Sequence, residues 1–395
     1  MNLRNLLQTR GSTCGSFYVI SQGRIHRQWE LWNKYLPKIH PYYAVKCNSD
    51  TNIIRWLGAL GSGFDCASAR EMEACEGVVD IKKVVFANPC KTANDIEVAR
   101  NSKVSTTTID SCEELDKMRD RAYMPELLLR IAVDDAASDT PFSKKFGLED
   151  WADVKRLYQA ATSKGFRVTG FSFHVGSGCH DFTQYERALA KVDCFWSSLR
   201  SLGAKHLETI DIGGGFRSEE SAFMPAATSI LKGVDALDAA KGATLIAEPG
   251  RFFATPSQDL FVKVIGKKPG LGGKGWRYTI DESVYGQFSC IPFDGQKPAF
   301  ARIGCGLRTQ AQGILFGRTC DSLDVIAYGS ELEELEIDDW LYFPHMGAYT
   351  TVSSSEFNGF PKPSLIVSTL ETAPESNQLI WQKGVEYALE IRNRI

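Results

Sequence analysis

The chain has 395 residues, 43% of them hydrophobic and 24% charged, so it is long enough for two domains with sizeable cores. Its 45 Lys and Arg nearly balance 48 Asp and Glu, for a net charge of -3, which argues against nucleic acid or an anionic membrane surface as the main partner. No apolar run approaches the ~20 residues of a transmembrane helix, and the first residues lack the apolar core of an export signal.

The cysteines indicate a cell compartment. Eleven Cys are scattered along the chain, an odd count without a CxxC pair. Scattered cysteines of this kind are typical of reduced thiols inside a cell. We therefore expect a cytoplasmic protein without a disulfide framework.

Apolar runs typical of buried strands alternate with segments of helical periodicity between residues 40 and 250. The predicted strands are 42–46, 64–68, 84–89, 106–110, 127–132, 171–177, 209–215 and 244–250. Capping residues predict the starts of four intervening helices, at Asp50, Ser68, Thr92 and Ser111. Eight strand–helix units predict a (β/α)8 barrel over residues 23–257. A doubly wound sheet is disfavoured, because Gly213-Gly214-Gly215 lacks the spacing of a dinucleotide fingerprint.

The pattern changes beyond residue 257, where helical periodicity is rare. Strand-like runs separated by Gly, Pro and Asp cover 259–268, 276–281, 300–304, 324–329, 339–344, 348–353 and 364–369. They predict a β-domain over residues 258–395, against which we expect residues 1–22 to pack. Within the barrel, residues 134–145 are predicted to form a polar, mobile loop.

Chemically capable side chains gather where the barrel strands end, which is where barrels hold their active sites. They are Lys46, Asp65, Asn88, Arg130, His174, Ser177, Gly213-Gly214-Gly215, Glu248, Gly250 and Arg251. A desolvated lysine such as Lys46 can form a Schiff base with a carbonyl, although an ion pair with Asp65 would explain it as well. The glycines would let backbone amides approach a phosphate.

Two further residues complete a possible cofactor site. Glu248 could keep a ring nitrogen protonated, and His174 could stack on a flat ring, although a lone His is more often a hydrogen-bonded core residue. This combination fits pyridoxal phosphate better than a metal, because the six His are dispersed and a metal site needs clustered His and carboxylates.

Ten motifs, in order, carry a resemblance to a known family. They are PYYAVKCN (41–48), GFDCAS (63–68), ANPCK (87–91), FHVGSGC (173–179), DIGGGF (211–216), AEPGRFF (247–253), VYGQFSC (284–290), TCDSLD (319–324), MGAYT (346–350) and FNGF (357–360). Through them the chain resembles the group IV, fold-type III pyridoxal-phosphate-dependent decarboxylases, especially the eukaryotic-type ornithine decarboxylases. The resemblance implies an alanine-racemase-like barrel, a β-domain, and a homodimer whose active sites are shared between subunits.

The resemblance also implies roles for residues of the barrel. Lys46 matches the lysine that binds the cofactor, and Asp65 and Glu71 match acids near it. Arg130 matches an arginine beside the cofactor ring, His174 the histidine stacked on it, and Glu248 the partner of its nitrogen. The residues that match the phosphate-binding set are Ser177, Gly214, Gly215, Gly250, Arg251 and, from the β-domain, Tyr349.

The resemblance further implies that residues of the β-domain bind the substrate. Cys320 matches the cysteine that guides protonation of the product, and Asp294 and Asp321 match the acids that bind the distal amine of the substrate. Phe293 and Phe357 are expected to line the same pocket. In this family Cys320 and Asp321 act in the partner's site.

Two positions depart from the family pattern. Arg318 stands where a proline usually precedes Thr-Cys, and it places a cation beside a pocket for a cationic amine. Phe293 stands where a tyrosine is usual, and it removes a hydroxyl near the distal amine.

The implied activity is decarboxylation of L-ornithine to putrescine. A preference for L-lysine or another basic amino acid stays open, because one methylene is worth only ~1–3 kcal/mol of discrimination. Diaminopimelate as a substrate would need a cation that binds its distal carboxylate, and Arg318 is the one residue that indicates such a cation. A non-catalytic regulator like the antizyme inhibitors is the alternative from another class, and a regulatory partner protein stays unknown.

Overall fold

The computed structural model describes residues 15–369 and 379–387. The parts of the expected β-domain at 370–378 and 388–395, and the expected packing of residues 1–14, lie outside the described residues. The chain divides into two compact units. One is His26–Phe253, and the other joins the described residues up to Ile25 to those from Ala254 onward.

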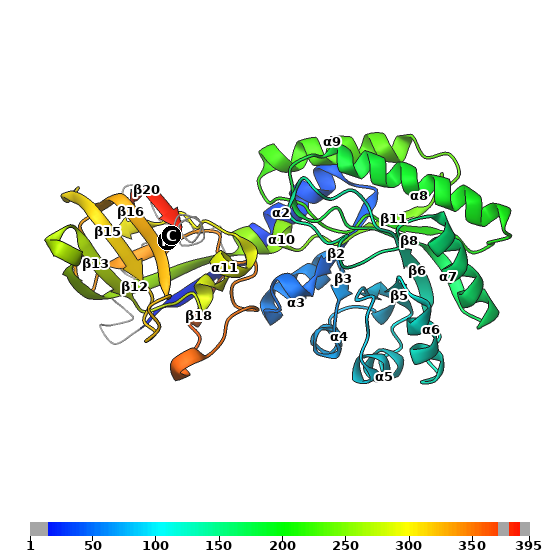
Figure 1. Cartoon of the computed structure of the whole chain (residues 1–395), viewed down its shortest axis with the longest axis horizontal. Coiled ribbons are helices and arrows are strands. Elements are labelled where there is room, and N and C mark those ends of the chain that lie inside the picture. Colours follow the sequence, from blue (N-terminus) through cyan, green and yellow to red (C-terminus); the bar gives the residue numbers. More distant parts are fainter. Residues whose placement is uncertain (1–14, 370–378, 388–395) are drawn as a thin grey trace. The chain divides into compact units, whose positions relative to one another are not determined.

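The first unit is a closed barrel of parallel strands (Figure 1). Its strands are β2 (Ile39–Ala44), β3 (Gly63–Cys66), β4 (Val84–Phe86), β5 (Thr106–Ile109), β6 (Glu126–Arg130), β8 (Arg167–Ser172), β10 (Thr209–Asp211) and β11 (Thr244–Ala247). They pair in sequence order, and β11 closes the barrel against β2. The predicted (β/α)8 barrel is confirmed.

Helices alternate with these strands. They are α2 (Gln22–Tyr35), α3 (Thr51–Leu60), α4 (Ala69–Cys75), α5 (Ala93–Asn101), α6 (Cys112–Arg119), α7 (Trp151–Ser163), α8 (Thr183–Ser201) and α9 (Glu220–Asp235). Three of the four predicted caps form side-chain bonds: Asp50 accepts from the Asn52 amide, Ser68 from that of Glu71, and Thr92 forms a capping box with its third helical residue. Ser111 stands at its predicted N-cap without a side-chain cap bond.

An aromatic cluster holds the loops that carry the candidate site. The fully buried Trp32 ring lies 5.1 Å from that of Phe216 and 5.4 Å from that of Phe252. Its indole nitrogen donates to the Ile39 carbonyl at 2.9 Å, which satisfies the polar atom. Because Phe216 directly follows the glycine triplet and Phe252 follows Arg251, this packing fixes both loops.

Two local predictions in the barrel were wrong. The strand expected to end at Lys46 ends at Ala44, and Val45–Cys47 form a short 3-10 helix. The predicted mobile loop 134–145 contains strand β7 (Ser138–Thr140), antiparallel to β9 (Ser177–Cys179). The buried Asp135 carboxylate orders this segment, because it accepts hydrogen bonds from two backbone amides of the same loop.

The second unit is built on a mixed sheet of ten strands. They are β1 (Phe17–Ser21), β12 (Gln258–Pro269), β13 (Trp276–Ile280), β14 (Ala301–Ile303), β15 (Gln310–Phe316), β16 (Val325–Glu333), β17 (Trp340–Phe343), β18 (Ser364–Ser368), β19 (Leu379–Trp381) and β20 (Lys383–Tyr387). Most pairs are antiparallel, but β13 with β15 and β1 with β18 are parallel. The predicted separate β-rich part is therefore present, and β1 belongs to its sheet.

The run 348–353, predicted as a strand, is a series of turns. The Thr350 and Ser353 hydroxyls donate to backbone carbonyls four residues earlier, and Tyr349 has a φ of 54°. Such local bonds compete with strand pairing. Across the described residues, no helix is both long and apolar enough to cross a membrane.

Candidate active site

Lys46 and Asp65 form an ion pair at the carboxyl ends of neighbouring strands. The Lys46 ammonium lies 2.6 Å from Asp65 Oδ2, and the Asp65 side chain is buried while that of Lys46 is 37% exposed. Ala44, two residues before the lysine, pairs with Asp65 in the ladder between β2 and β3. The ion pair considered as an alternative for Lys46 is thus present, and it points the amine into the mouth of the barrel.

A pair of carboxyl groups lies beside this ion pair. Asp211 ends β10 and is fully buried, and Glu248 follows β11. Burial raises the pKa of Glu248 well above its usual value, and the Asp211 and Asp65 charges raise it further. Burial likewise raises the pKa of Asp211. Asp211 is buried and Glu248 is half-buried, and two desolvated carboxyl groups in contact cannot both ionise at low cost, so the pair retains a proton.

His174 is a neutral imidazole in this site. Its Nδ1 accepts a hydrogen bond from the Gly176 amide at 3.0 Å, so that nitrogen carries no proton. Burial lowers the pKa of His174 well below its usual value, and the cations Lys46 and Arg130 lower it further. The Phe142 ring contacts it at 4.7 Å in an edge-on geometry and holds the imidazole plane.

Ser177 and Arg251 meet at one corner of the barrel mouth. The Arg251 guanidinium donates to Ser177 Oγ through Nε at 3.0 Å and through an Nη at 2.7 Å. Gly215 faces the same loop, because a Cβ there would lie 2.7 Å from the Gly176 carbonyl oxygen, and its φ of 103° favours glycine. A guanidinium, a hydroxyl and closely approaching backbone are the groups that bind a phosphate.

Gly214 lies close to the two residues expected to contact a cofactor ring. A Cβ on Gly214 would lie 2.8 Å from His174 Nε2 and 2.7 Å from the Glu248 carbonyl oxygen. The backbone of the glycine triplet therefore approaches both residues so closely that it leaves no room for a side chain.

Three more residues named from the sequence lie in the same barrel mouth. Arg130 ends β6, with its guanidinium 4.8 Å from the Phe146 ring. The Glu71 carboxylate accepts from the Ala67 amide at 2.7 Å, and burial raises its pKa although Lys46 opposes the shift. A Cβ on Gly250 would lie 3.0 Å from the Cys47 side chain, so the backbone after Glu248 packs directly on the turn that carries Lys46.

Unpartnered polar atoms test whether these residues fit pyridoxal phosphate. Asp65 Oδ1, Thr108 Oγ1 and Ser172 Oγ are buried in the barrel without a hydrogen-bond partner. Such atoms are rare in folded proteins and indicate a missing partner. Pyridoxal phosphate has polar ring substituents that could bond to these atoms. Its carbonyl, ring nitrogen and phosphate would meet the amine of Lys46, the proton-bearing carboxyl pair and the guanidinium of Arg251, so the residues present fit the cofactor.

Asp211 is a site residue that sequence reasoning missed. Its Oδ1 accepts from the Gly213 amide at 2.9 Å, and its carboxyl group interacts with that of Glu248. The signal was available, because an acid that ends an apolar strand directly before three glycines faces the barrel mouth.

In the second unit, Cys320 and Asp321 lie in an exposed loop that polar side chains hold in place. The Cys320 amide donates to the Asn358 side chain at 3.1 Å, and Asp321 accepts from the Tyr285 hydroxyl. The Tyr285 ring packs 4.5 Å from that of the partly exposed Phe357. Cys320, Asp321 and Phe357 therefore share one surface of this unit.

Arg318, one of the two departures from the family pattern, contacts residues of its own unit. Its guanidinium stacks 4.3 Å from the Phe360 ring and donates to the Pro361 carbonyl at 3.1 Å. One Nη lies 3.9 Å from the buried Glu282 carboxylate. The guanidinium of Arg318 thus has three partners within its own unit.

Asp294 ends helix α11 (Cys290–Asp294) and accepts from Gln296 Nε2 at 2.6 Å. The same amide donates to the Ala348 carbonyl at 2.9 Å, so Asp294 and Tyr349 belong to one group of contacts. Phe293 is 77% exposed. The positive φ of Tyr349, 54°, is the kind of backbone strain that concentrates at functional sites.

Comparisons with known proteins identify the family. A sequence model described as pyridoxal-dependent decarboxylase, pyridoxal binding domain, matches residues 22–255. An ornithine decarboxylase of Caenorhabditis elegans is 37% identical over 363 residues, which cover 88% of this chain and 86% of that protein. Antizyme inhibitor 2 of Xenopus laevis is 35% identical over 395 residues, covering 96% and 86%.

Among solved structures, the arginine decarboxylase of Paramecium bursaria Chlorella virus bound to agmatine superposes with a TM-score of 0.87. It is 32% identical and the match covers 92% of this chain and all of that one. The match spans the barrel and the β-rich unit alike. The chain belongs to the family of pyridoxal-dependent decarboxylases.

Proposed function

We propose that this protein decarboxylates L-ornithine to putrescine and CO2, with pyridoxal phosphate in the barrel. The observation that carries this proposal is the ion pair between Lys46 and Asp65 beside the carboxyl pair of Asp211 and Glu248. An amine and a proton-bearing carboxyl group in one barrel mouth suit the carbonyl and the ring nitrogen of that cofactor. The ornithine decarboxylase relative supports the choice of substrate.

The residues of the barrel would share the work as follows. Lys46 would bind the cofactor, and the Ser177–Arg251 corner with the backbone of Gly214, Gly215 and Gly250 would hold its phosphate, together with Tyr349. His174 would stack on the ring, with Asp65, Glu71 and Arg130 around it. When bound, pyridoxal phosphate supplies the electron sink that decarboxylation needs.

Glu248 would keep the ring nitrogen protonated. Its pKa is raised by burial and by neighbouring carboxylates, so in the empty site the carboxyl group carries a proton that a pyridine nitrogen can share. A protonated ring withdraws electrons more strongly, and this favours loss of CO2 over racemisation.

The β-rich unit would supply the substrate side. Asp294 and Asp321 would bind the distal ammonium of ornithine through charge-assisted hydrogen bonds, beside Phe293 and Phe357. Cys320, exposed in its loop, would deliver a proton to the carbon that lost CO2. Since Arg318 is turned toward Glu282 and Phe360, its charge does not oppose a cationic substrate.

Substrate preference is tested by measuring CO2 release from L-ornithine, L-lysine, L-arginine and diaminopimelate under identical conditions. We expect the highest kcat/KM with ornithine and a lower value with lysine, which is one methylene longer. A higher kcat/KM with lysine or arginine would refute the substrate assignment, and no release from any of them would favour a regulator.

The regulator is the second candidate, because an antizyme inhibitor is among the relatives. Against it stand the intact cofactor residues, above all the Lys46–Asp65 pair and the Ser177–Arg251 corner. Purified protein with the visible absorbance of bound cofactor would favour the enzyme, and colourless protein that takes up no added cofactor would favour the regulator.

We further propose a homodimer with shared active sites, in which Cys320 and Asp321 act with the partner's barrel. Lys46→Ala and Cys320→Ala homodimers should then both be impaired. After mixing and subunit exchange, half of the dimers are hybrids and each has one intact site of two, so about a quarter of the wild-type activity should return. No recovery, with hybrids demonstrated by a mass tag, would mean that each site is built within one chain.

The proposal also covers the cell compartment and the domain boundaries. We place the protein in the cytoplasm, because the cysteines of the described part of the chain are free thiols, as expected in a reducing compartment. We also assign residues 23–257 to the cofactor-binding domain and residues 258–395, with the N-terminal segment, to the substrate-side domain.

A further inference from the structure

Cys320 stands at the tip of a loop whose base is firmly held. The buried Asp324 carboxylate accepts from the Thr319 amide at 3.0 Å and from the Thr319 hydroxyl at 2.6 Å, and the Gly317 amide donates to the Asp324 carbonyl at 2.8 Å. At the tip, the bond from the Cys320 amide to Asn358 Oδ1 is the one hydrogen bond of Cys320 within the part of the chain that the structure describes. The position of this exposed cysteine therefore depends on Asn358.

Asn358 is itself held by the residues on both sides of it. The Phe357 ring packs 4.5 Å from the ring of Tyr285. The Phe360 ring lies 4.3 Å from the guanidinium of Arg318, two residues before the cysteine. These contacts join the turn that carries the asparagine to the loop that carries the cysteine, so the asparagine side chain has a defined place beside that loop.

The conformation of Asn358 distinguishes a local role from a remote one. Its φ of 58° lies in the left-handed region, which asparagine adopts more readily than most residues other than glycine. In turns, an asparagine side chain usually bonds to its own backbone about two residues on. Here Oδ1 accepts from a residue 38 positions away in the chain. The side chain therefore stabilises the cysteine loop.

We propose that Asn358 is a positioning residue for Cys320, because its Oδ1 fixes the backbone from which the thiol reaches the carbon that has lost CO2. The inference rests on the role of Cys320 in the proposed function. In that step the S–H bond of the cysteine breaks, a C–H bond of the product forms, and solvent returns a proton to the thiolate. A general acid must lie within hydrogen-bond reach of its target. If the loop is displaced and the proton reaches another atom, CO2 is released but the amine is not formed.

The first test measures amide hydrogen exchange at Cys320 in the full-length, cofactor-loaded protein. Asn358→Gly keeps the left-handed turn and removes the acceptor, so exchange of this amide should become roughly three- to tenfold faster, the contribution of one hydrogen bond. Asn358→Asp retains an acceptor oxygen and should keep the wild-type rate. Equal rates in all three proteins would overturn the proposal, because the hydrogen bond would then not hold the loop.

The second test measures the amine formed per CO2 released from the preferred amino acid. Wild type should form the two in equal amounts, and Asn358→Gly should form at least about twofold less amine than CO2. Asn358→Asp should stay close to wild type. A loss of stability alone would lower the amount of active protein, and it would leave this ratio unchanged.

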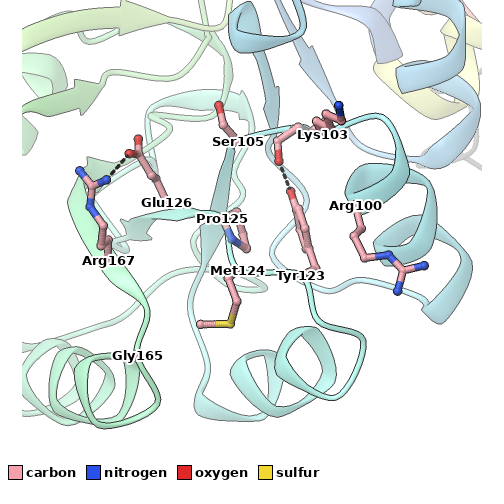
Figure 2. A pocket seen from close by; sticks show the side chains of 10 residues that line it. Arg100, Lys103, Ser105, Tyr123, Met124, Pro125, Glu126, Gly165 and Arg167 are labelled. Carbon is pink, nitrogen blue, oxygen red and sulfur yellow. Dashed lines mark hydrogen bonds and ion pairs between the residues drawn. The ribbon is translucent and has the colours of Figure 1, made fainter.

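Two matched controls separate positioning from stability. Asp338→Gly makes the same kind of substitution at another exposed residue of this unit, with a φ of 73°. Tyr123→Phe removes one bond from a side chain to the backbone in the barrel unit, that from its hydroxyl to the Val104 carbonyl at 3.0 Å (Figure 2). Both should form amine and CO2 in equal amounts.

The outcomes distinguish the inference from the proposed function. Equal amounts of amine and CO2 from Asn358→Gly, while Cys320→Ala forms less amine, would overturn the positioning role alone. Equal amounts from Cys320→Ala would refute the role of Cys320 in protonation. An amine deficit in either control as large as that in Asn358→Gly would also overturn the inference, because the deficit would then not depend on the bond to Cys320.

Discussion

Gly214→Ala should weaken cofactor binding in addition to destabilising the cofactor-free protein. The added methyl would lie 2.7 Å from the Glu248 carbonyl oxygen and 2.8 Å from His174 Nε2, about 0.7 Å and 0.6 Å inside the 3.4 Å at which ordinary contact begins. Its φ is not in the left-handed region, so the effect comes from this overlap. Overpacking of this kind costs typically ~1–3 kcal/mol.

The overlap with the Glu248 carbonyl oxygen is present with or without cofactor, so part of the cost falls on both states. The overlap with His174 adds to the bound state, because the imidazole can move away from the methyl only while no ring lies against it. A penalty of ~1–3 kcal/mol corresponds to a dissociation constant raised roughly 5- to 150-fold. The assay is titration of the apoprotein with pyridoxal phosphate, followed by the visible absorbance, alongside thermal unfolding of the apoprotein.

Gly203→Ala is the matched control. Gly203 has a φ of 92° with no atom within 4 Å of the added methyl, so the substitution costs ~1–2 kcal/mol of stability through backbone strain alone. Its cofactor affinity should stay at the wild-type value. Wild-type affinity in Gly214→Ala, or an equal loss in Gly203→Ala, would refute the close approach of His174 and Glu248 to the glycine in the cofactor site.

Three other expectations concern single side chains. Glu248→Ala should lower kcat far more than cofactor affinity, because the charge on the ring nitrogen matters most as CO2 leaves; unchanged kcat at saturating cofactor would remove its assigned role. Arg318→Ala should change KM for ornithine less than about twofold and cost ~1 kcal/mol of stability through the lost stacking on Phe360; a large fall in KM would mean that the guanidinium faces the substrate. Burial raises the pKa of Glu282 from 4.5 to about 7, so its protonated form contributes stability that is full below pH 4.5 and lost as pH rises through about 7, ~3 kcal/mol at most. Urea unfolding at pH 5 and pH 7 should show this loss of unfolding free energy in wild type and little of it in Glu282→Gln. An equal loss between the two pH values in both proteins would contradict the burial of this charge.

The barrel could be predicted because its short strands alternate with segments of helical periodicity, several of which begin at a capping residue. Asp50 and Thr92 illustrate this, since the hydrogen bonds that their side chains make are local and can be anticipated from three or four residues. The strand ending at Lys46 was predicted too long, because apolar content alone cannot distinguish the last residues of a strand from a buried 3-10 turn.

The β-rich unit was less predictable. Strand β15 was missed because it alternates exposed and half-buried residues and contains a glycine, and its parallel pairing with β13 depends on distant residues. The run 348–353 was assigned to a strand because hydroxyl bonds to the backbone were not anticipated.

In the candidate site, residue types at strand ends identified Lys46, His174 and Glu248, but two features required three dimensions. The coupling of Asp211 to Glu248 depends on β10 and β11 being neighbours. The orientation of Arg318 depends on Phe360 and Glu282, which are remote from it in sequence.

The most direct test of the central claim is to reduce the cofactor-loaded enzyme with borohydride without substrate and to map the labelled peptide. Our account predicts one phosphopyridoxyl group per chain, on Lys46, and a loss of CO2 release from ornithine in proportion to the label. A label on another lysine, or full activity after Lys46 is labelled, would contradict it.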